Sequence, residues 1–297
     1  MELTYTCHSE YGFLESVFLK DVEAAFIDES SIKEQWEELN YLSPPVFDAC
    51  QNEYAAFKDL LKKQGSTIHL LPTHHKTGMD SMYCRDASIA TDAGMILCRM
   101  GKKQRQGEPK AARESFLAKD VPLFGTIEAP GMVEGGDVAW LDPKTLAVGH
   151  GYRTNQAGID QLTQLLNSIS VKVIQVELPH YKGPNDVFHL MSIFSPVDKN
   201  SAVVYSPLMS VKFRKELLNR GYDLVEVPEE EFDSMGCNVL AIAPRVCVMV
   251  KGNPITKSRL EKAGCTVYEY EGQEISVKGG GGPTCLTRPI GRYVELG

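Results

Sequence analysis

The order of predicted elements repeats along this chain, and the repeat is the feature that most constrains the fold. From Val138, two short apolar strands are followed by an amphipathic helix at 155–169 and a third strand at 171–178. Asn155 is a typical helix N-cap, and apolar residues from Ile159 onward recur on one helix face. Short apolar runs between turn residues are typical of strands. The unit is therefore strand, strand, helix, strand.

The same order is found in four more parts of the chain. Two copies follow and one precedes, although the last strand of the preceding copy is weak: 190–228, 238–271 and 87–118. A further copy forms if the C-terminal segment pairs with the N-terminal one, and its parts are 285–290, 14–20, 45–65 and 66–72. Such units cannot bury their apolar faces alone, so they stack on their neighbours. The sequence therefore predicts an α/β fold of five stacked units.

Closure of the five units into a ring predicts one domain spanning residues 1–297. A chain of this length is long enough for two average domains or for one large repetitive domain. A closed ring leaves no unpaired terminal strand, which favours closure because unpaired strands aggregate. An ordinary α/β sandwich, in which strands and helices alternate without closing, is the alternative.

Composition and charge argue against some classes of partner. Apolar residues make up 43% of the chain and charged residues 24%, and the formal net charge is −8. Basic runs are short, so we expect no nucleic-acid partner, whereas a small cation is compatible with an acidic chain. The N-terminal residues lack the apolar core of a signal peptide, and apolar runs such as 246–250 are too short to span a bilayer. We therefore expect no membrane partner and a cytoplasmic location.

One of the eight cysteines stands in a context that favours chemistry. The cysteines as a group lack CxxC pairs and histidines at zinc-ligand spacing, so we expect most of them to be reduced, buried and inert. Cys285 differs because it follows four glycines and a proline in GGGGPTC. We interpret this segment as a flexible loop that lets a ligand approach closely, and Cys285 as a nucleophile rather than a loop residue.

Reactive residue types recur at one position of the repeat. The residues just before the first strand of each unit are Asp86, Asp137, His189, Asn238 and Cys285, with separations of 51, 52, 49 and 47. Equivalent positions of a closed ring converge on its axis. The sequence therefore predicts that two carboxylates, a histidine, an amide and a thiol meet at a central site. A lone histidine among apolar residues is usually a core residue, and only this register favours a functional His189.

Carboxylates beside a thiol favour a cationic substrate. Glu134 joins Asp137 in the segment MVEGGDV, where a turn-forming role is the alternative for Glu134. A planar guanidinium pairs with carboxylates through charge-assisted hydrogen bonds, and its positive charge favours the thiolate form of Cys285.

Six segments of the chain resemble the guanidino-group-modifying family, which includes arginine deiminases, dimethylarginine dimethylaminohydrolases and amidinotransferases. They occur in the family's order and are CRDASI (84–89), MVEGGDV (132–138), GYRTNQ (151–156), FHLMSIF (188–194), GCNVLAI (236–242) and GGGGPTCLTRPI (279–290). The resemblance implies the pentein fold, a five-bladed α/β propeller of pseudo-repeated ββαβ units around a central active site.

The resemblance also implies catalytic roles. Cys285 matches the nucleophile that attacks the guanidinium carbon and forms a covalent amidino-thioether. His189 matches the general acid for the leaving amine and then the base that activates water. Glu134 matches the carboxylate that orients this histidine and binds a guanidinium nitrogen, and Asp86 matches the acid that clamps the guanidinium.

Further residues are expected to contact the substrate. Arg105 and Arg153 match arginines that hold a substrate α-carboxylate in deiminases, with a surface role as the alternative for Arg105. Asp137 is expected to contact the substrate amino group or to satisfy backbone donors of the ring, and Asn238 is placed at the site by its register.

One departure from the family pattern points to the substrate. Arginine deiminases and amidinotransferases carry His-x-Asp at the histidine, whereas this chain has His189, Leu190 and Met191. A methionine suits an alkylated nitrogen, because methyl groups pack on a thioether and cannot satisfy a carboxylate. This favours hydrolysis of Nω,Nω-dimethylarginine to citrulline and dimethylamine. The alternatives are an arginine deiminase or arginine dihydrolase, an amidinotransferase, and a non-catalytic ribosome-binding pentein.

The predicted chemistry requires no metal and no organic cofactor, and no GxxxxGK[ST] nucleotide loop is present. The expected partner is a small cationic guanidino substrate, and a homodimer is one expectation for the oligomeric state. Two segments are lid candidates because of their polarity and position, namely 7–13 and 76–82.

Overall fold

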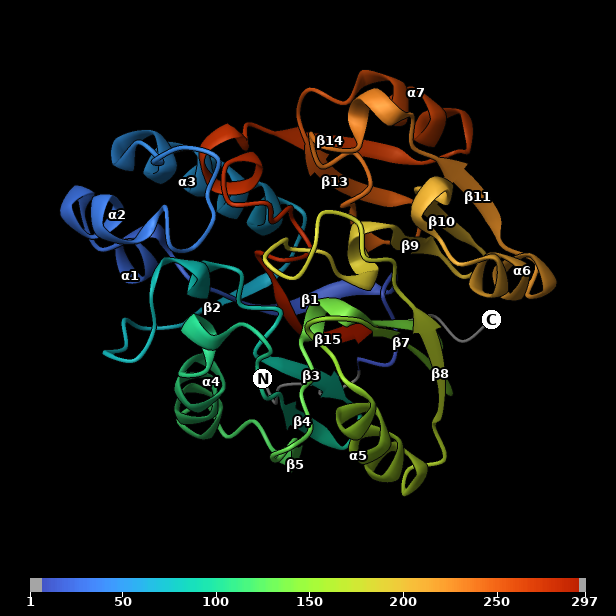
Figure 1. Cartoon of the computed structure of the whole chain (residues 1–297). Helices are drawn as coiled ribbons and strands as arrows, with labels where there is room; N and C mark the ends of the chain where they lie inside the picture. Colours follow the sequence, from blue (N-terminus) through green and yellow to red (C-terminus); the bar gives the residue numbers. More distant parts are fainter. Residues whose placement is uncertain (1–6, 294–297) are drawn as a thin grey trace.

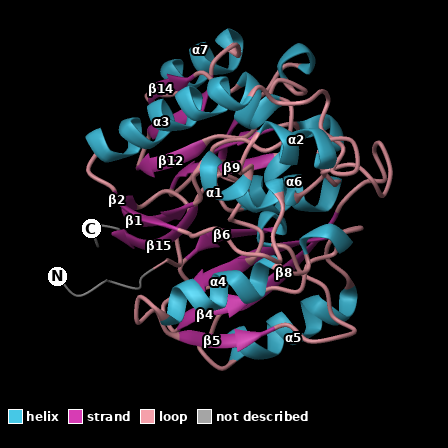
Figure 2. Cartoon of the chain, turned by 90° about the vertical axis from the view of Figure 1, so that its left-hand side faces the viewer, coloured by secondary structure: helices cyan, strands magenta, loops and turns pink. Residues whose placement is uncertain are grey.

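The computed structural model describes residues 7–293, and the strands within this range form five sheets of three strands each. The sheets surround a common centre, and most of the helices lie on the outside of the ring (Figure 1). Figure 2 shows the ring from the side, with α3 and α7 at one end, α4 and α5 at the other, and strands between them. The predicted five-unit α/β ring is confirmed.

Each sheet is one blade of the ring. Blade one contains β15 (Arg288–Tyr293), β1 (Phe13–Leu19) and β2 (Thr67–Leu70). Blade two contains β3 (Ser88–Thr91), β4 (Gly94–Leu97) and β5 (Leu123–Thr126). Blade three contains β6 (Val138–Asp142), β7 (Thr145–His150) and β8 (Lys172–Glu177). Blade four contains β9 (Phe194–Asp198), β10 (Ser201–Val204) and β11 (Asp223–Glu226). Blade five contains β12 (Leu240–Ala243), β13 (Val246–Val250) and β14 (Thr266–Tyr270).

One helix connects the middle strand of each blade to its third strand. In blade order these helices are α3 (Phe47–Lys63), α4 (Glu108–Leu117), α5 (Gln156–Asn167), α6 (Val211–Asn219) and α7 (Pro254–Lys262). Blade one carries two more short helices, which the repeat did not predict: α1 (Val22–Ala25) and α2 (Glu29–Gln35). Within residues 7–293, no helix is both long enough and apolar enough to cross a membrane.

All five blades share one topology. The first strand runs antiparallel to the middle strand, and the third strand runs parallel to it. A parallel pair needs a crossover connection, which the helix supplies. First and middle strands are almost completely buried, whereas third strands are partly exposed. Closure therefore pairs the two ends of the chain but leaves each blade with its own outer edge strand.

Strands β1 and β15 close the ring. They pair in antiparallel register from Phe13 opposite Tyr293 to Phe18 opposite Arg288, as the sequence predicted. Two further bonds tie the C-terminal segment to blade two: the backbone N–H of Arg85 donates to the carbonyl of Cys285 at 3.2 Å, and Nη1 of Arg288 donates to the carbonyl of Ser88 at 2.6 Å. The last strand is thus hydrogen-bonded to two blades.

The first strand of blade four differs from the prediction. The apolar run at 190–194 was expected to be a strand, but Leu190–Ser192 forms a short 3₁₀ turn and β9 begins at Phe194. The hydroxyl of Ser192 accepts the backbone N–H of His189 at 3.1 Å, which stabilises the turn. Pro196 lies inside β9, an edge strand of its sheet, where a residue without a backbone N–H can be accommodated.

The side chain of Asn155 stabilises both the start of α5 and the segment at 130–132. Its Oδ1 accepts the N–H of Gly158 at 2.9 Å, which confirms the predicted N-cap, and also the N–H of Met132 at 2.9 Å. Its Nδ2 donates to the carbonyl of Pro130 at 3.0 Å. One side chain therefore joins the start of α5 to the segment that leads into MVEGGDV.

We predict that Asn155→Ala lowers the free energy of unfolding by about 1–2 kcal/mol, because it removes an N-cap and two further bonds. Urea denaturation measures this loss. The exposed neighbour Gln156 provides the control, since Gln156→Ala is expected to change stability by no more than about 0.5 kcal/mol. Equal stability of the two variants would contradict the capping role.

Candidate active site

The five residues of the repeat register are buried at the centre of the ring. Asp86, Asp137, His189, Asn238 and Cys285 precede β3, β6, β9, β12 and β15, and none is more than 7% exposed. Two groups form among them: an acid–histidine cluster and a thiol–amide pair. Residues from both groups line one cavity, so the ring brings the predicted site together.

The acid–histidine cluster is centred on His189. Its Nε2 lies 2.7 Å from Oε2 of Glu134, and its Nδ1 lies 4.0 Å from Oδ1 of Asp86. Glu134 is completely buried, and its other oxygen accepts the backbone N–H of Lys102 at 2.9 Å. A buried carboxylate with both oxygens engaged fixes the imidazole plane. The turn-forming alternative for Glu134 is therefore not what its side chain does.

Asp137 binds the backbone next to His189. Its two oxygens accept the hydroxyl of Thr154 at 2.7 Å and the backbone N–H of Leu190 at 3.1 Å. Both bonds are internal to the protein, and the second one holds the turn that begins after His189. Of the two roles expected for Asp137, the geometry matches the one that satisfies backbone donors.

Buried charge shifts the pKa values of this cluster. Burial alone would lower the pKa of His189, but the charges of Asp86 and Asp137 and the bond to Glu134 outweigh it and raise the pKa to about 9. Burial would raise the pKa of Glu134, but His189 and Arg153 hold it well below its usual range. Burial raises the pKa of Asp137 to about 6. At neutral pH the cluster therefore contains an imidazolium.

Cys285 is held by the amide of blade five. Nδ2 of Asn238 donates to Sγ of Cys285 at 3.4 Å, and Oδ1 of Asn238 accepts the N–H and the hydroxyl of Thr284 at 3.0 and 2.9 Å. Burial raises the pKa of the Cys285 thiol, the charge of Asp86 adds to this, and the Asn238 and Thr284 contacts oppose it. The thiol is therefore neutral at physiological pH. Thr284 was missed by sequence reasoning, and only its place beside the cysteine pointed to it.

The glycine run before Cys285 is packed rather than flexible, which corrects the sequence interpretation. A Cβ at Gly279 would lie 1.9 Å from the hydroxyl of Tyr83, and one at Gly281 would lie 2.5 Å from the same ring. A Cβ at Gly282 would lie 2.5 Å from Cγ of Asn238, and Gly280 has a positive φ of 72°. Each glycine is required by close contact or by backbone conformation, so the loop presents the thiol rigidly.

Asp86 keeps one carboxylate oxygen unpaired. Its Oδ2 accepts Nη1 of Arg105 at 2.5 Å, whereas its buried Oδ1 has no hydrogen-bond partner among the described residues. Arg105 also donates from Nε and Nη2 to the two oxygens of Glu108, both at 2.8 Å. All three guanidinium nitrogens of Arg105 thus donate within the protein. This arginine lies in the interior, not on the surface.

Arg153 is less completely engaged. Its Nη2 donates to the carbonyl of Asp186 at 3.2 Å. Its Nη1 lies 3.5 Å from Oε2 of Glu134, but the angle does not make a hydrogen bond and the atom is left without a partner. We regard this contact as a charge interaction. Neither Arg153 nor Arg105 lines the cavity that contains Cys285.

That cavity has a volume of about 260 Å³. His189, Met191, Asn238 and Cys285 lie on its walls, so four of the predicted site residues face the same space. Other residues that line it lie within 40–42, 181–188, 232–235 and 277–280, and of these the sequence singled out Phe188 and the two glycines at 279–280.

Neither predicted lid lies over this cavity. Cys7 to Glu10 is buried, and the carboxylate of Glu10 is clamped by Nη2 of Arg85 at 2.9 Å. Met79–Met82 is a buried 3₁₀ turn. Glu10, Asp80 and Ser81 bond within the protein, whereas Lys76 is exposed but does not line the cavity. The lid expectation was therefore wrong for both segments.

Asp86, Glu134 and His189 are also the one group among the described residues whose ligand atoms are close enough to hold a metal ion, all within 4.8 Å of one another. A metal would compete for the histidine nitrogen that lies against Glu134. A planar cation with N–H donors leaves that pair intact and supplies the hydrogen bond that Oδ1 of Asp86 lacks.

Comparison with known proteins identifies the family. The sequence model of the family described as "N,N dimethylarginine dimethylhydrolase, eukaryotic" matches residues 23–292. The chain belongs to this family. Membership of the N,N-dimethylarginine dimethylhydrolase family makes it a guanidino-group-modifying enzyme that acts on amidine C–N bonds, and it confirms the resemblance inferred from the six segments.

Relatives share the whole length of the family fold. An N(G),N(G)-dimethylarginine dimethylaminohydrolase from Pseudomonas aeruginosa is 26% identical over 84% of this chain and 91% of its own length. The solved structure of the Pseudomonas aeruginosa enzyme with citrulline has a TM-score of 0.76 at 22% identity and covers 93% of this chain and 98% of that chain. SxtG, an amidinotransferase from Microseira wollei, has a TM-score of 0.81 at 15% identity and 99% coverage of both chains. The two structures establish the pentein fold.

We predict that Gly136→Ala lowers kcat/KM by about hundredfold, because a misplacement near 1 Å in a catalytic group has that cost. A Cβ at Gly136 would lie 2.5 Å from Nδ1 of His189 and 2.7 Å from Oδ1 of Asp86. The matched control is Gly151→Ala, where the nearest atom lies at 3.4 Å and belongs to the side chain of Leu178. Steady-state kinetics on both folded variants measures the difference, and equal activities would show that the cluster tolerates displacement.

Proposed function

We propose that this enzyme hydrolyses the guanidinium C–N bond of Nω,Nω-dimethylarginine, releasing citrulline and dimethylamine. The observation that carries the proposal is the buried Oδ1 of Asp86, which has no hydrogen-bond partner among residues 7–293 and lies 4.0 Å from Nδ1 of His189. An unpaired buried carboxylate oxygen is costly, and a guanidinium N–H supplies the missing donor. The neutral thiol of Cys285 faces the same cavity as His189.

The first half of the reaction forms a covalent intermediate. The bound cation lies against Asp86 and offsets its charge, which together with burial keeps the pKa of Cys285 high, so the thiol gives up its proton to solvent. Sγ attacks the guanidinium carbon, and the bond from that carbon to the dimethylated nitrogen breaks. His189, protonated at neutral pH, gives its proton to this nitrogen, which leaves as dimethylamine.

The second half releases the product. The imidazole of His189, now neutral, takes a proton from water, and the resulting hydroxide attacks the carbon of the amidino-thioether. The carbon–sulfur bond breaks and citrulline is formed, so one water is consumed for each dimethylamine released. Glu134 stabilises the imidazolium and fixes its orientation throughout, through the 2.7 Å contact.

Two residues receive positioning roles and a third receives a substrate-binding role. Arg105 is held in a bidentate pair with Glu108, which supports a role in fixing Asp86 instead of the carboxylate-binding role expected from the family pattern. Asn238 fixes the Cys285 thiol by its 3.4 Å contact. Arg153 retains an unpaired Nη1 and remains the proposed partner of the substrate α-carboxylate.

The wall of the cavity supports an alkylated substrate. Met191 is buried and faces the cavity at the position where deiminases of this superfamily carry an aspartate, and Phe188 lines the same wall. Contact with a thioether and an aromatic ring stabilises bound methyl groups, whereas an N–H would lose a hydrogen bond there.

The ring closure through β1 and β15 also supports one catalytic domain spanning residues 1–297.

The proposed activity predicts that dimethylarginine gives citrulline and dimethylamine with a kcat/KM at least about tenfold above that for arginine, the discrimination that one or two buried methyl groups provide. Arginine, monomethylarginine and agmatine complete the panel, and agmatine tests the carboxylate contact.

Cys285→Ser is expected to abolish turnover, and Met191→Asp to shift preference towards arginine, with Met191→Leu as its control. Ornithine and a new guanidino product with added glycine would indicate an amidinotransferase, and full turnover by Cys285→Ser would exclude the covalent route.

The neutral thiol predicts that a cationic reagent labels Cys285 much faster than a neutral one. At pH 7 we expect 2-chloroacetamidine to outpace iodoacetamide by at least about tenfold after each rate is normalised to glutathione, because only the amidinium pairs with Asp86 and lowers the thiol pKa. Labelling by iodoacetamide should rise only at alkaline pH, because burial and the charge of Asp86 raise the pKa of the Cys285 thiol.

The variant Asp86→Asn provides the control for this labelling. Removal of the carboxylate lowers the pKa of Cys285, so iodoacetamide should react faster at pH 7 than with the unchanged enzyme, while the advantage of the amidinium reagent disappears. An unchanged ratio of the two rates in Asp86→Asn would contradict the cation-assisted ionisation.

A further inference from the structure

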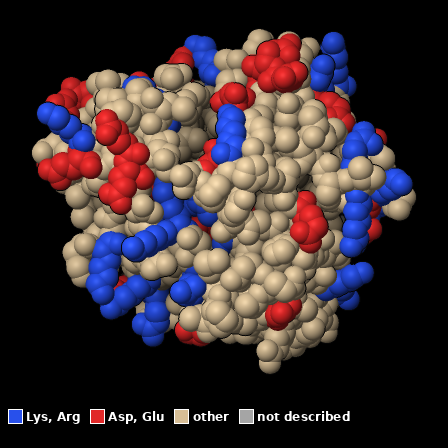
Figure 3. Space-filling model, in the orientation of Figure 1, with Lys and Arg blue, Asp and Glu red and all other residues tan. Residues whose placement is uncertain are grey.

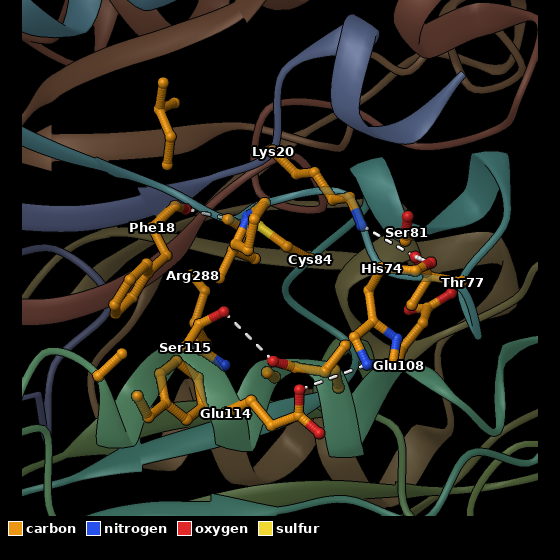
Figure 4. Close-up of a pocket in the computed structure, with 18 of the residues that line it drawn as sticks. Phe18, Lys20, His74, Thr77, Ser81, Cys84, Glu108, Glu114, Ser115 and Arg288 are labelled. Carbon is orange, nitrogen blue, oxygen red and sulfur yellow. Dashed lines mark hydrogen bonds and ion pairs between the residues drawn. The ribbon is translucent and has the colours of Figure 1, made fainter. Parts of the chain in front are cut away.

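A second cavity lies against helix α4. It is enclosed by β1, the segment 70–81, helix α4 and the start of β15, and it has a volume of about 360 Å³ (Figure 4). This volume is in the range of small-molecule sites. The two cavities share no lining residue, so the second one is not an extension of the active site.

Most of the wall of this second cavity is apolar. The residues that supply it are Phe18, Leu70, Leu71, Pro72, Ala87, Ala111, Ala112, Phe116 and Ala118. Such a lining favours a ligand whose body is a compact hydrocarbon group and disfavours a small inorganic ion, which would lose its hydration without replacement.

Two buried cations face the apolar wall. Lys20 is 2% exposed and Arg288 is 4% exposed, and in Figure 4 both lie above the cavity, opposite Glu114 and Ser115 of α4. Nζ of Lys20 donates to the hydroxyl of Thr77 at 3.0 Å, and no carboxylate of residues 7–293 lies within 4.0 Å of either cation. A buried cation without a counter-ion is costly, so both are poised to accept an anion.

Arg288 has donors to spare. Its Nη1 donates to the carbonyls of Arg85 and Ser88 at 3.3 and 2.6 Å, and its Nε donates to the carbonyl of Pro289 at 3.3 Å. These partners are neutral, and Nη2 makes no hydrogen bond to any group of residues 7–293. Lys20 likewise has three N–H donors and a single bonded partner. The cavity therefore presents unused donors from two charged groups.

Burial lowers the pKa of Lys20 and the charge of Glu108 opposes this, but neither carboxylate that lines the cavity makes an ion pair within 4.0 Å with Lys20 or Arg288. Both oxygens of Glu108 are held by Arg105, and Glu114 is half exposed at the rim, 3.4 Å from Nε2 of His74. Lys and Arg side chains also gather over α4 on the face shown in Figure 3. A positive surface over α4 raises the local concentration of anions near that helix.

We propose that this cavity binds a small organic monoanion, a carboxylate carried on a compact branched or aromatic hydrocarbon group. The carboxylate lies between Lys20 and Arg288 and accepts charge-assisted hydrogen bonds from both. The hydrocarbon group packs against the apolar wall formed by β1 and α4, which includes the rings of Phe18 and Phe116.

Glu108 makes a binding measurement preferable to an activity assay. This residue lies on the wall of the cavity and also holds Arg105, which contacts Asp86 at 2.5 Å in the active site. A change at the cavity that disturbs Glu108 would alter turnover whether or not the cavity binds an anion. The test therefore uses calorimetric titration of the full chain with 3-methylbutanoate and with benzoate.

We expect 3-methylbutanoate and benzoate to bind with a stoichiometry of one. They should bind equally to protein alkylated at Cys285, in which the alkyl group occupies the active-site cavity. The neutral isostere 3-methylbutanamide and inorganic phosphate should each bind at least about tenfold more weakly, because one lacks the charge and the other the apolar body. The proposal is overturned if neither carboxylate binds, if alkylation removes binding, or if phosphate binds as tightly as the carboxylates.

Matched variants locate the site. Lys20→Met should weaken 3-methylbutanoate binding by at least about tenfold, since it removes a charged hydrogen-bond donor and keeps the apolar stem. Lys119→Met, the same change at an exposed lysine on the rim, should leave affinity unchanged. Ala111→Phe fills the cavity and should abolish binding with Lys20 intact, which keeps the test decisive if Lys20→Met fails to fold. Binding that survives Ala111→Phe would place the anion elsewhere.

Discussion

The antiparallel pairing of β1 with β15 is the contact on which the rest of this structure depends. It joins the two ends of the chain and completes the first blade. It also places Cys285, which lies just before β15, against blade two, where its carbonyl accepts the N–H of Arg85 at 3.2 Å. Without this pairing, the thiol and the carboxylate of Asp86 would belong to opposite ends of an open chain, and no common site would exist.

The centre of the ring contains an unusual density of buried charge, and its balance explains the chemistry. Glu134 and His189 compensate one another through a 2.7 Å contact, and the charges of Asp86 and Asp137 add to it, so the enzyme holds an imidazolium without substrate. Cys285, in contrast, is uncharged, because burial and a nearby carboxylate raise the pKa of its thiol and keep it protonated. A guanidinium cation beside Asp86 offsets the charge of that carboxylate and so lowers the pKa of the thiol. For this reason, substrate binding and nucleophile activation are one event in the proposed mechanism.

Several expectations failed for reasons that local pattern does not contain. The apolar run at 190–194 looked like a strand, but a side-chain bond from Ser192 turned its first half into a 3₁₀ turn. The glycine run looked flexible, yet its members are needed because Tyr83 and Asn238 pack against the backbone. Arg105 looked available to a carboxylate, but Glu108, three residues later, occupies it.

The sequence by itself determined the number of blades, the order of the three strands and one helix in each blade, the cap at Asn155 and the register that puts five reactive residues at one level of the ring. These features depend on hydrophobic periodicity and on residue type, which are local properties. Only the tertiary structure decided which donor meets which acceptor. The unpaired Oδ1 of Asp86 and the uncompensated charges of Lys20 and Arg288 arise where separate blades meet. Such pairings depend on distances of a few tenths of an ångström across segments far apart in the chain, and periodicity carries no information about them.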